Sequence, residues 1–226
     1  DSEMIKSIAT ISANNDEEIG KIIAEAFASV GEDGAVSVEE GSGFETVVHK
    51  VDGLQFDRGL LSTYFSTSPE KAEVSMRNPL ILVVQGKLTT TEQAMAIIQP
   101  VIKLGRGLVV LADDIIGDAL STLILNKMKG GHQIAAVKTP GFGDYRKDLS
   151  IDIASIIGAE VVPSEMVVDI TDEHVEQLFG SASTVKVEQM STVIMGGKRI
   201  QGIVEARIKT IEDKINDIKI TTFERN

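Results

Sequence analysis

The sequence predicts an α/β fold with an open, mostly parallel sheet flanked by helices. Residues 80–84 form a continuous apolar run, which is typical of a strand covered on both faces. Downstream, short apolar runs alternate with stretches of helical periodicity, and the links between them are short. Such alternation indicates parallel strands joined by crossover helices.

Each further element of this fold has its own signal in the sequence. Helical spacing of apolar residues predicts helices over residues 91–104, 117–128 and 144–157. Short apolar runs predict parallel strands over residues 108–112, 133–137 and 160–162. Two later runs predict an antiparallel pair over residues 184–187 and 192–195. Residues 54–79 show no clean period, and a last helix is expected around Val204, Ile208 and Ile211.

The first 52 residues predict a separate, partial α+β segment. Helices are expected in the first 30 residues, and Gly31 is expected to end the second of them. Asn14 or Asn15 is expected to cap this second helix, ahead of an acidic first turn. Two strands over 35–39 and 44–51 would follow as a hairpin.

The composition argues against several classes of function. The 226-residue chain has 22 Lys and Arg against 34 Asp and Glu, and its net charge of −12 disfavours nucleic acid and anionic membranes. Trp and Cys are both 0, so we expect no base-stacking platform, no disulfide and no thiolate metal site. No apolar run approaches the ~18 residues of a membrane span. Because the chain begins at Asp1, we expect it to be part of a longer protein.

The sequence shows no convincing catalytic constellation. It has no GxxxxGK[ST] phosphate loop, and the glycines of residues 141–143 lack the third glycine of a dinucleotide fingerprint. A tight turn leading to a helix cap at Asp144 is the better interpretation. The histidines share no metal-ligand spacing and are expected at the surface or at edges: His49, His132 and His174.

One alternative function is a Mg²⁺-dependent phosphoryl-transfer or receiver-like domain. Asp113 and Asp114 follow one predicted strand and Lys138 ends the next, where an open α/β sheet presents its site. Two carboxylates and a lysine could hold Mg²⁺. A solvated loop explains these residues more simply, because a receiver also needs a third acid on an intervening strand.

Two of the predicted helices have apolar faces wider than a core requires. With ~100° per residue, the apolar arcs span roughly 180° in the helix at 91–104 and roughly 240° in the helix at 117–128, against the ~100° that a surface helix needs. One edge of the first helix is expected to face the sheet: Ile97, Val101 and Leu104. The other edge then needs a different cover: Met95, Ile98 and Ile102. A second core layer is the simpler explanation, and an exposed, protein-binding groove is the alternative.

Several short segments resemble the GroEL-type group I chaperonins (the sixty-kilodalton heat-shock class). They are Thr10-Ile11-Ser12-Ala13-Asn14, Gln55-Phe56-Asp57-Arg58-Gly59, Asp118-Ala119-Leu120-Ser121-Thr122-Leu123 with Asn126, and Val137-Lys138-Thr139-Pro140-Gly141-Phe142-Gly143-Asp144 with Arg146-Lys147. None of these segments is a catalytic motif. The order in which the segments follow one another is specific to this family, and the resemblance covers most of the chain.

The resemblance implies a division into two domains. Residues 1–52 are similar to the first segment of the intermediate domain, and residues 53–226 to the apical, polypeptide-binding domain without its last helix, with Gly53 at the hinge. The family's ATP and Mg²⁺ site lies in an equatorial domain outside this chain. We therefore expect no enzymatic activity and no cofactor in this part, although the full-length family is an ATPase.

The resemblance also implies a molecular chaperone that binds non-native polypeptides and the mobile loop of a GroES-type co-chaperonin through an apolar groove. The implied binding residues are Leu60, Ser62, Tyr64, Phe65, Met95, Ile98, Ile102, Leu120, Ile124, Leu125 and Asn126. The full-length family forms homo-oligomeric rings for ATP-dependent protein folding, whereas this part is expected to be monomeric. We expect a cytoplasmic or organelle-matrix protein with no nucleic-acid or membrane partner.

The sequence departs from the family pattern in the proposed groove. Gln99 stands where an acid is common and Leu60 where an aromatic residue is common. Pro100 is unexpected within a helix, because it removes a backbone hydrogen bond and costs ~3 kcal/mol unless the helix kinks or ends.

Overall fold

The chain divides into two compact units. In the computed structural model, residues 2–30, 53–67, 72–197 and 201–216 are described. Unit 1 comprises Asp1–Asp52 and unit 2 comprises Gly53–Asn226. The assignment of these units to an intermediate and an apical domain stays a prediction.

Unit 1 contains a helical hairpin, α1 (Ser2–Ser12) and α2 (Glu17–Val30), whose helices pack against each other. The contact is close at Gly20, because a Cβ there would lie 1.9 Å from the hydroxyl oxygen of Thr10. Only glycine fits this crossing without a shift of the neighbouring helix. The strands expected over 35–39 and 44–51 lie outside the described residues.

The turn between α1 and α2 corrects the predicted cap. Asn14 and Asn15 have positive φ angles of 57° and 66°, a left-handed conformation that asparagine tolerates. The side chain of Asp16 is the N-cap, because its Oδ1 accepts hydrogen bonds from the amides of Glu18 and Ile19. The asparagines therefore make the turn and the aspartate caps the helix.

Unit 2 is built on a mixed sheet of eight strands with the main order β1-β8-β7-β3-β4-β5, in which β2 also pairs with β7 and β6 with β3. The strands are β1 (Gly53–Phe56), β2 (Val74–Arg77), β3 (Leu80–Leu88), β4 (Leu108–Ile115), β5 (Ile134–Lys138), β6 (Val161–Pro163), β7 (Gly180–Val187) and β8 (Thr192–Gly197).

The prediction of a mostly parallel sheet is wrong, although the α/β class is confirmed. The pairings β3–β4, β4–β5 and β3–β6 are parallel, as the alternating pattern predicted. The pairings β1–β8, β2–β7, β3–β7 and β7–β8 are antiparallel. The difference comes from β1 and β2, which are four residues each within a segment without periodicity, and from the β7–β8 hairpin joining β3.

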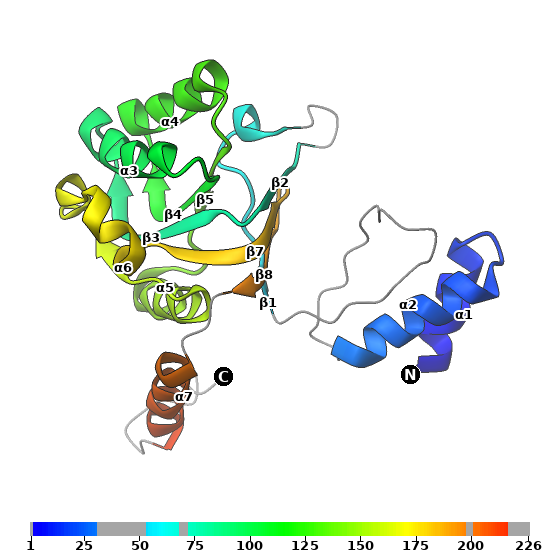
Figure 1. The fold of residues 1–226 in the computed structure, drawn as a ribbon. Coiled ribbons are helices and arrows are strands. Elements are labelled where there is room, and N and C mark those ends of the chain that lie inside the picture. The colour runs from blue at the N-terminus through cyan, green and yellow to red at the C-terminus, as the bar shows by residue number, and fades with distance from the viewer. Residues whose placement is uncertain (1, 31–52, 68–71, 198–200, 217–226) are drawn as a thin grey trace. The chain divides into compact units, whose positions relative to one another are not determined.

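Helices cover both faces of the parallel part of the sheet (Figure 1). α3 (Thr91–Lys103) and α4 (Gly117–Gly130) lie on one face, and α5 (Gly143–Ile157) lies on the other. Along β3 the burial alternates accordingly: Leu82 and Val84 pack toward α3 and α4, and Ile81 and Val83 pack toward α5. The remaining elements are η1 (Thr63–Phe65), η2 (Val167–Asp169), η3 (Asp172–His174), α6 (Val175–Leu178) and α7 (Gln201–Asn216).

The start of α5 differs in detail from the prediction. Gly141 and Gly143 have φ angles of 79° and 56°, so the predicted tight turn is confirmed. Phe142, however, occupies the N-cap position without a side-chain cap, and Asp144 lies in the first turn, where it pairs with Lys147 at 2.9 Å. The N-cap position therefore lies at Phe142, two residues before the predicted cap at Asp144.

Among the residues that the structure describes, none of the helices has the length and apolar character needed to cross a bilayer.

Candidate binding surface on the outer helices

α3 and α4 lie side by side, and polar contacts join their facing edges. The hydroxyl oxygens of Thr122 and Thr91 lie 3.4 Å apart, and the Asn126 amide nitrogen lies 4.0 Å from the sulfur of Met95. The same amide donates to the carbonyl of Thr122 at 2.8 Å. These contacts hold Met95 and Asn126, two of the predicted site residues, against each other at the seam between the helices.

The other side of α4 is joined to η1, which packs against α4 and β5. Ser62 caps η1, because its hydroxyl accepts a hydrogen bond from the amide of Tyr64 at 3.3 Å. Lys127 of α4 donates from Nζ to the carbonyl of Ser66 at 2.6 Å. Sequence reasoning did not identify Lys127, since a lone lysine on a helix gives no signal of a contact 61 residues away.

The predicted site residues fall into three groups by burial. Two are exposed, Tyr64 at 62% and Leu125 at 49%. Seven are half-buried: Leu60, Ser62, Met95, Ile102, Leu120, Ile124 and Asn126. Two are fully buried: Phe65 and Ile98. The structure places these exposed and half-buried residues along α3, α4 and η1, except for Leu60, which precedes η1 and forms an isolated β-bridge with Val137.

The burial of Ile98 corrects the predicted division of α3 into a sheet-facing edge and an outer edge. Ile98 is 0% exposed and belongs to the main core, whereas Leu104, expected to face the sheet, is 54% exposed. The sheet-facing edge is therefore shifted toward Ala94 and Ile98, and the outer edge keeps only Met95 and Ile102. Phe65 likewise anchors η1 in the core, and its side chain offers no surface.

On α4 two neighbouring residues differ in burial. Leu123 is fully buried, and Ile124 is half-buried and packs on the rim of the core. Leu125 and Met128 lie farther round the helix and are exposed. Met128 extends the apolar surface by one turn beyond the predicted site, and the wide apolar arc of this helix already included it.

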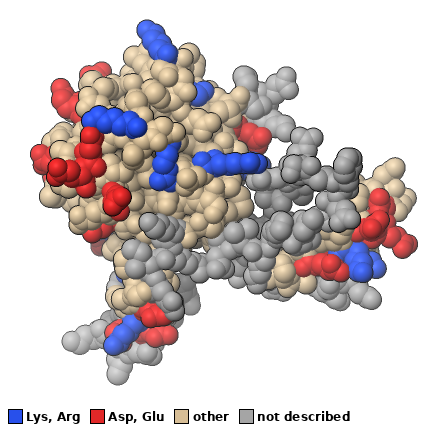
Figure 2. All heavy atoms as spheres, in the orientation of Figure 1, with Lys and Arg blue, Asp and Glu red and all other residues tan. Residues whose placement is uncertain are grey.

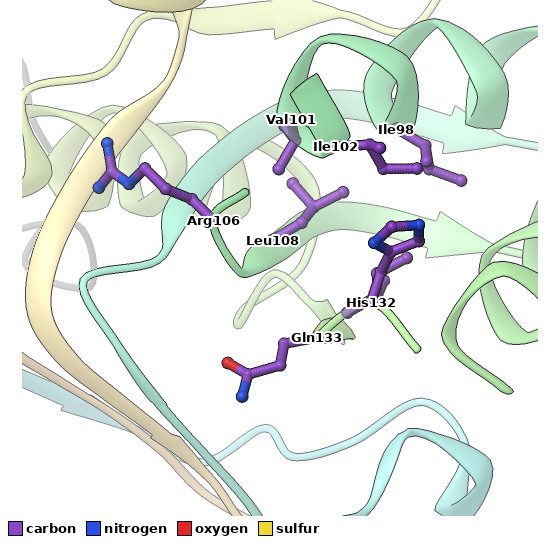
Figure 3. A pocket seen from close by; sticks show the side chains of 8 residues that line it. Ile98, Val101, Ile102, Arg106, Leu108, His132 and Gln133 are labelled. Atoms are coloured by element: carbon purple, nitrogen blue, oxygen red, sulfur yellow. The ribbon is translucent and has the colours of Figure 1, made fainter. Parts of the chain in front are cut away.

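Two hollows border α3 among the described residues, and the smaller one lies next to the outer surface. The cavity next to it measures about 10 Å³ and is bordered by Ile98, Val101, Ile102, Arg106, Leu108, His132, Gln133 and Ile134 (Figure 3). That volume suits about one water molecule, whereas small-molecule sites occupy roughly 300 Å³ or more. The second hollow is larger, about 470 Å³, and it is lined by α3 and by residues 170–173: Ala96, Gln99, Pro100, Lys103, Ile170, Thr171, Asp172 and Glu173.

Charged groups frame the surface more than they occupy it. On the face seen in Figure 2, broad stretches of unit 2 carry no Lys, Arg, Asp or Glu. At the start of α3, hydrogen bonds from the backbone and from Thr90 hold the pKa of Glu92 below its ordinary value. At its end, Lys103 pairs with Asp172 of η3 at 2.5 Å.

The alternative phosphoryl-transfer site is occupied by its own ion pair. Lys138 Nζ lies 2.9 Å from Asp114 Oδ1, and the backbone carbonyl of Asp113 lies 3.5 Å from the guanidinium of Arg146. Within the described ranges, no three or more His, Cys, Asp or Glu residues are grouped so as to hold a metal ion. The simpler interpretation, a solvated loop after the strand, is wrong, because Asp113 and Asp114 lie within β4 and are half-buried.

Gly53, the predicted hinge, begins β1. A Cβ at this position would lie 2.5 Å from the carbonyl oxygen of Ile194 on β8. Close approach of two strands is thus sufficient to require glycine here, and a role as a hinge stays a prediction.

No protein-family model matches the chain. The resemblance to the group I chaperonins therefore rests on the order of the short segments in the sequence, and it stays a prediction.

Proposed function

We propose that unit 2 is a polypeptide-binding module, the apical domain of a chaperonin-like protein that assists folding. It would hold non-native chains on the outer surface of α3, α4 and η1. A co-chaperonin mobile loop would compete for the same surface. Assembly into an ATP-driven ring would depend on parts of a longer protein, as the resemblance implies.

The strongest support for this proposal is a row of apolar side chains that reach solvent although the core beneath them is already fully buried. Leu125, Met128 and Tyr64 are exposed, and Ile124 and Leu120 are half-buried, although the core beneath them is closed by Leu123 and Ala119. Contiguous apolar surface of this kind marks sites that bind protein.

The shape of the surface favours an extended or helical segment over a small molecule. The seam between α3 and α4 and the junction of α4 with η1 run on either side of one helix, so apolar contacts are available on both of its sides. Met95 and Met128 add flexible side chains, which adapt to different partners. A surface that accepts many non-native sequences needs such adaptability.

Binding of an unfolded protein tests the proposal. We expect the chain to bind a permanently unfolded protein, such as reduced and carboxymethylated lactalbumin, in a pull-down or by fluorescence anisotropy. Ile124→Glu should reduce this binding by about tenfold or more, because the carboxylate would have to be desolvated against an apolar partner.

Ile151→Glu is the matched control, because Ile151 is a partly exposed isoleucine on α5, on the opposite face of the sheet. It introduces the same charge and should leave binding within about twofold of the parent. Equal loss in both variants would show a general charge effect. Full binding by Ile124→Glu would contradict the proposed site.

A further inference from the structure

α7 is attached to the rest of unit 2 through very few side chains. Over the part of the helix whose side chains are described, 202–213, only Val204 and Arg207 are partly buried. Ile203, Ile208 and Ile211 are all exposed. A helix that buries so little apolar surface gains little from the hydrophobic effect, so a specific contact must hold it in place.

Arg207 makes that contact with α5. Its Nε lies 2.5 Å from Asp152 Oδ1, and its terminal nitrogen lies 3.2 Å from Asp148 Oδ1 and 3.4 Å from the Asp148 carbonyl oxygen. The Arg207 side chain is only 13% exposed. One guanidinium thus bridges two acids four residues apart, and we refer to this contact as the ionic latch.

The latch also reduces the repulsion between two acidic side chains of α5. Two carboxylates at positions i and i+4 of a helix repel each other. Arg207 neutralises that repulsion, and its planar fork suits two acceptors at once. Burial lowers the pKa of Arg207, but the hydrogen bonds and charges of Asp152 and Asp148 outweigh this effect, so the pKa lies above its ordinary value.

We propose that α7 is a releasable helix that docks on α5 through the ionic latch and can leave it while the sheet and its other helices stay folded. Docking depends on the bridged charges, because the isoleucines of α7 keep a large exposed fraction and only Val204 and Arg207 are partly buried among its described side chains. Undocking uncovers Asp148 and Asp152 together. This conformational device is separate from the outer surface of α3 and α4.

Hydrogen exchange followed by mass spectrometry on the whole chain tests the latch. We expect Arg207→Gln to speed the exchange of α7 amides by about tenfold or more, as loss of charged hydrogen bonds predicts. Exchange in β3, β4 and β5 should stay within about twofold of the parent. Unchanged protection of α7 would overturn the proposal, and so would equally faster exchange in the sheet, since Arg207 would then support the whole fold.

A matched control and a charge swap separate the latch from helix propensity. Lys209→Gln removes a positive charge from an exposed position of the same helix and should leave α7 protection within about twofold of the parent. The double variant Arg207→Glu with Asp152→Arg reverses the pair and should restore most of the protection lost in Arg207→Glu alone. Failure of this rescue would assign the loss to the helix itself and overturn the latch.

Discussion

α3 and α4 cover the same face of the sheet, yet they bury different amounts of their apolar surface. α4 has the wider apolar arc in the sequence, but Ala119 and Leu123 are its only fully buried residues, whereas α3 buries five: Ala94, Ile97, Ile98, Pro100 and Val101. The difference lies in their neighbours. α3 is flanked by α4 and η2, whereas α4 leads to β5, the last strand of the sheet order, and has η1 beyond it.

The width of an apolar arc therefore sets the largest apolar surface that a helix can bury. The elements packed around the helix determine how much of that surface is actually buried. Pro100 supports the same conclusion. α3 continues to Lys103 despite this proline, which packs inside the unit with only three helical residues after it. Packing on one side of the helix thus tolerates a residue that an isolated helix would not.

The largest effect is expected from paired substitutions on α4. Leu123→Glu should bury an unpaired carboxyl group and cost several kcal/mol of a stability that is typically about 5–15 kcal/mol. Ile124→Glu should change the free energy of unfolding by less than about 1 kcal/mol, because its side chain reaches solvent. Urea unfolding of both variants measures the difference. Equal destabilisation would show that Ile124 belongs to the core and would break the contrast between the helices.

A second pair tests α3 in the same way. Ile98→Ala should cost about 2–5 kcal/mol, because Ile98 is fully buried in the core. Met95→Ala should cost less than about 1 kcal/mol, since Met95 lies half-buried at the seam with α4. Thermal or urea unfolding checks both values. If Met95→Ala were as costly as Ile98→Ala, the seam would be core and α3 would offer no outer edge.

The smallest effects are expected at the two helix starts. α3 begins with a capping box, in which Thr90 accepts a hydrogen bond from the Gln93 amide and the Gln93 side chain accepts one from the Thr90 amide. The N-cap residue of α4 is Ile116, which has extended backbone angles and makes no side-chain cap hydrogen bond. Thr90→Ala should therefore destabilise the protein by about 1 kcal/mol, and Ile116→Ser should stabilise it by about 0.5–1 kcal/mol.

Chemical unfolding monitored by circular dichroism resolves shifts of this size. Destabilisation by Ile116→Ser would mean that the half-exposed isoleucine contributes more by packing than a cap would add. In that case the start of α4 is held as firmly as that of α3, and the difference between the helices is confined to their outer faces.

The exposure of a candidate site residue could be predicted where it depends on the position of that residue around its own helix. The neighbouring residues Leu123 and Ile124 differ as their ~100° separation on the helix predicts. The pattern failed for Ile98 and Leu104, because it could not tell on which side of the apolar arc the sheet would lie. It also could not find Lys127, whose partner Ser66 belongs to a segment without periodicity.

The sequence by itself determined the α/β class, the three helices of the sheet and its parallel strands, because each of these elements shows its period within a single stretch of chain. The tertiary structure decided the rest. β1 and β2 became strands because β8 and β7 offered free backbone groups to pair with, and this made the sheet mixed. The docking of α7 depends on Arg207 meeting two acids more than 50 residues away, and no local pattern records such a meeting.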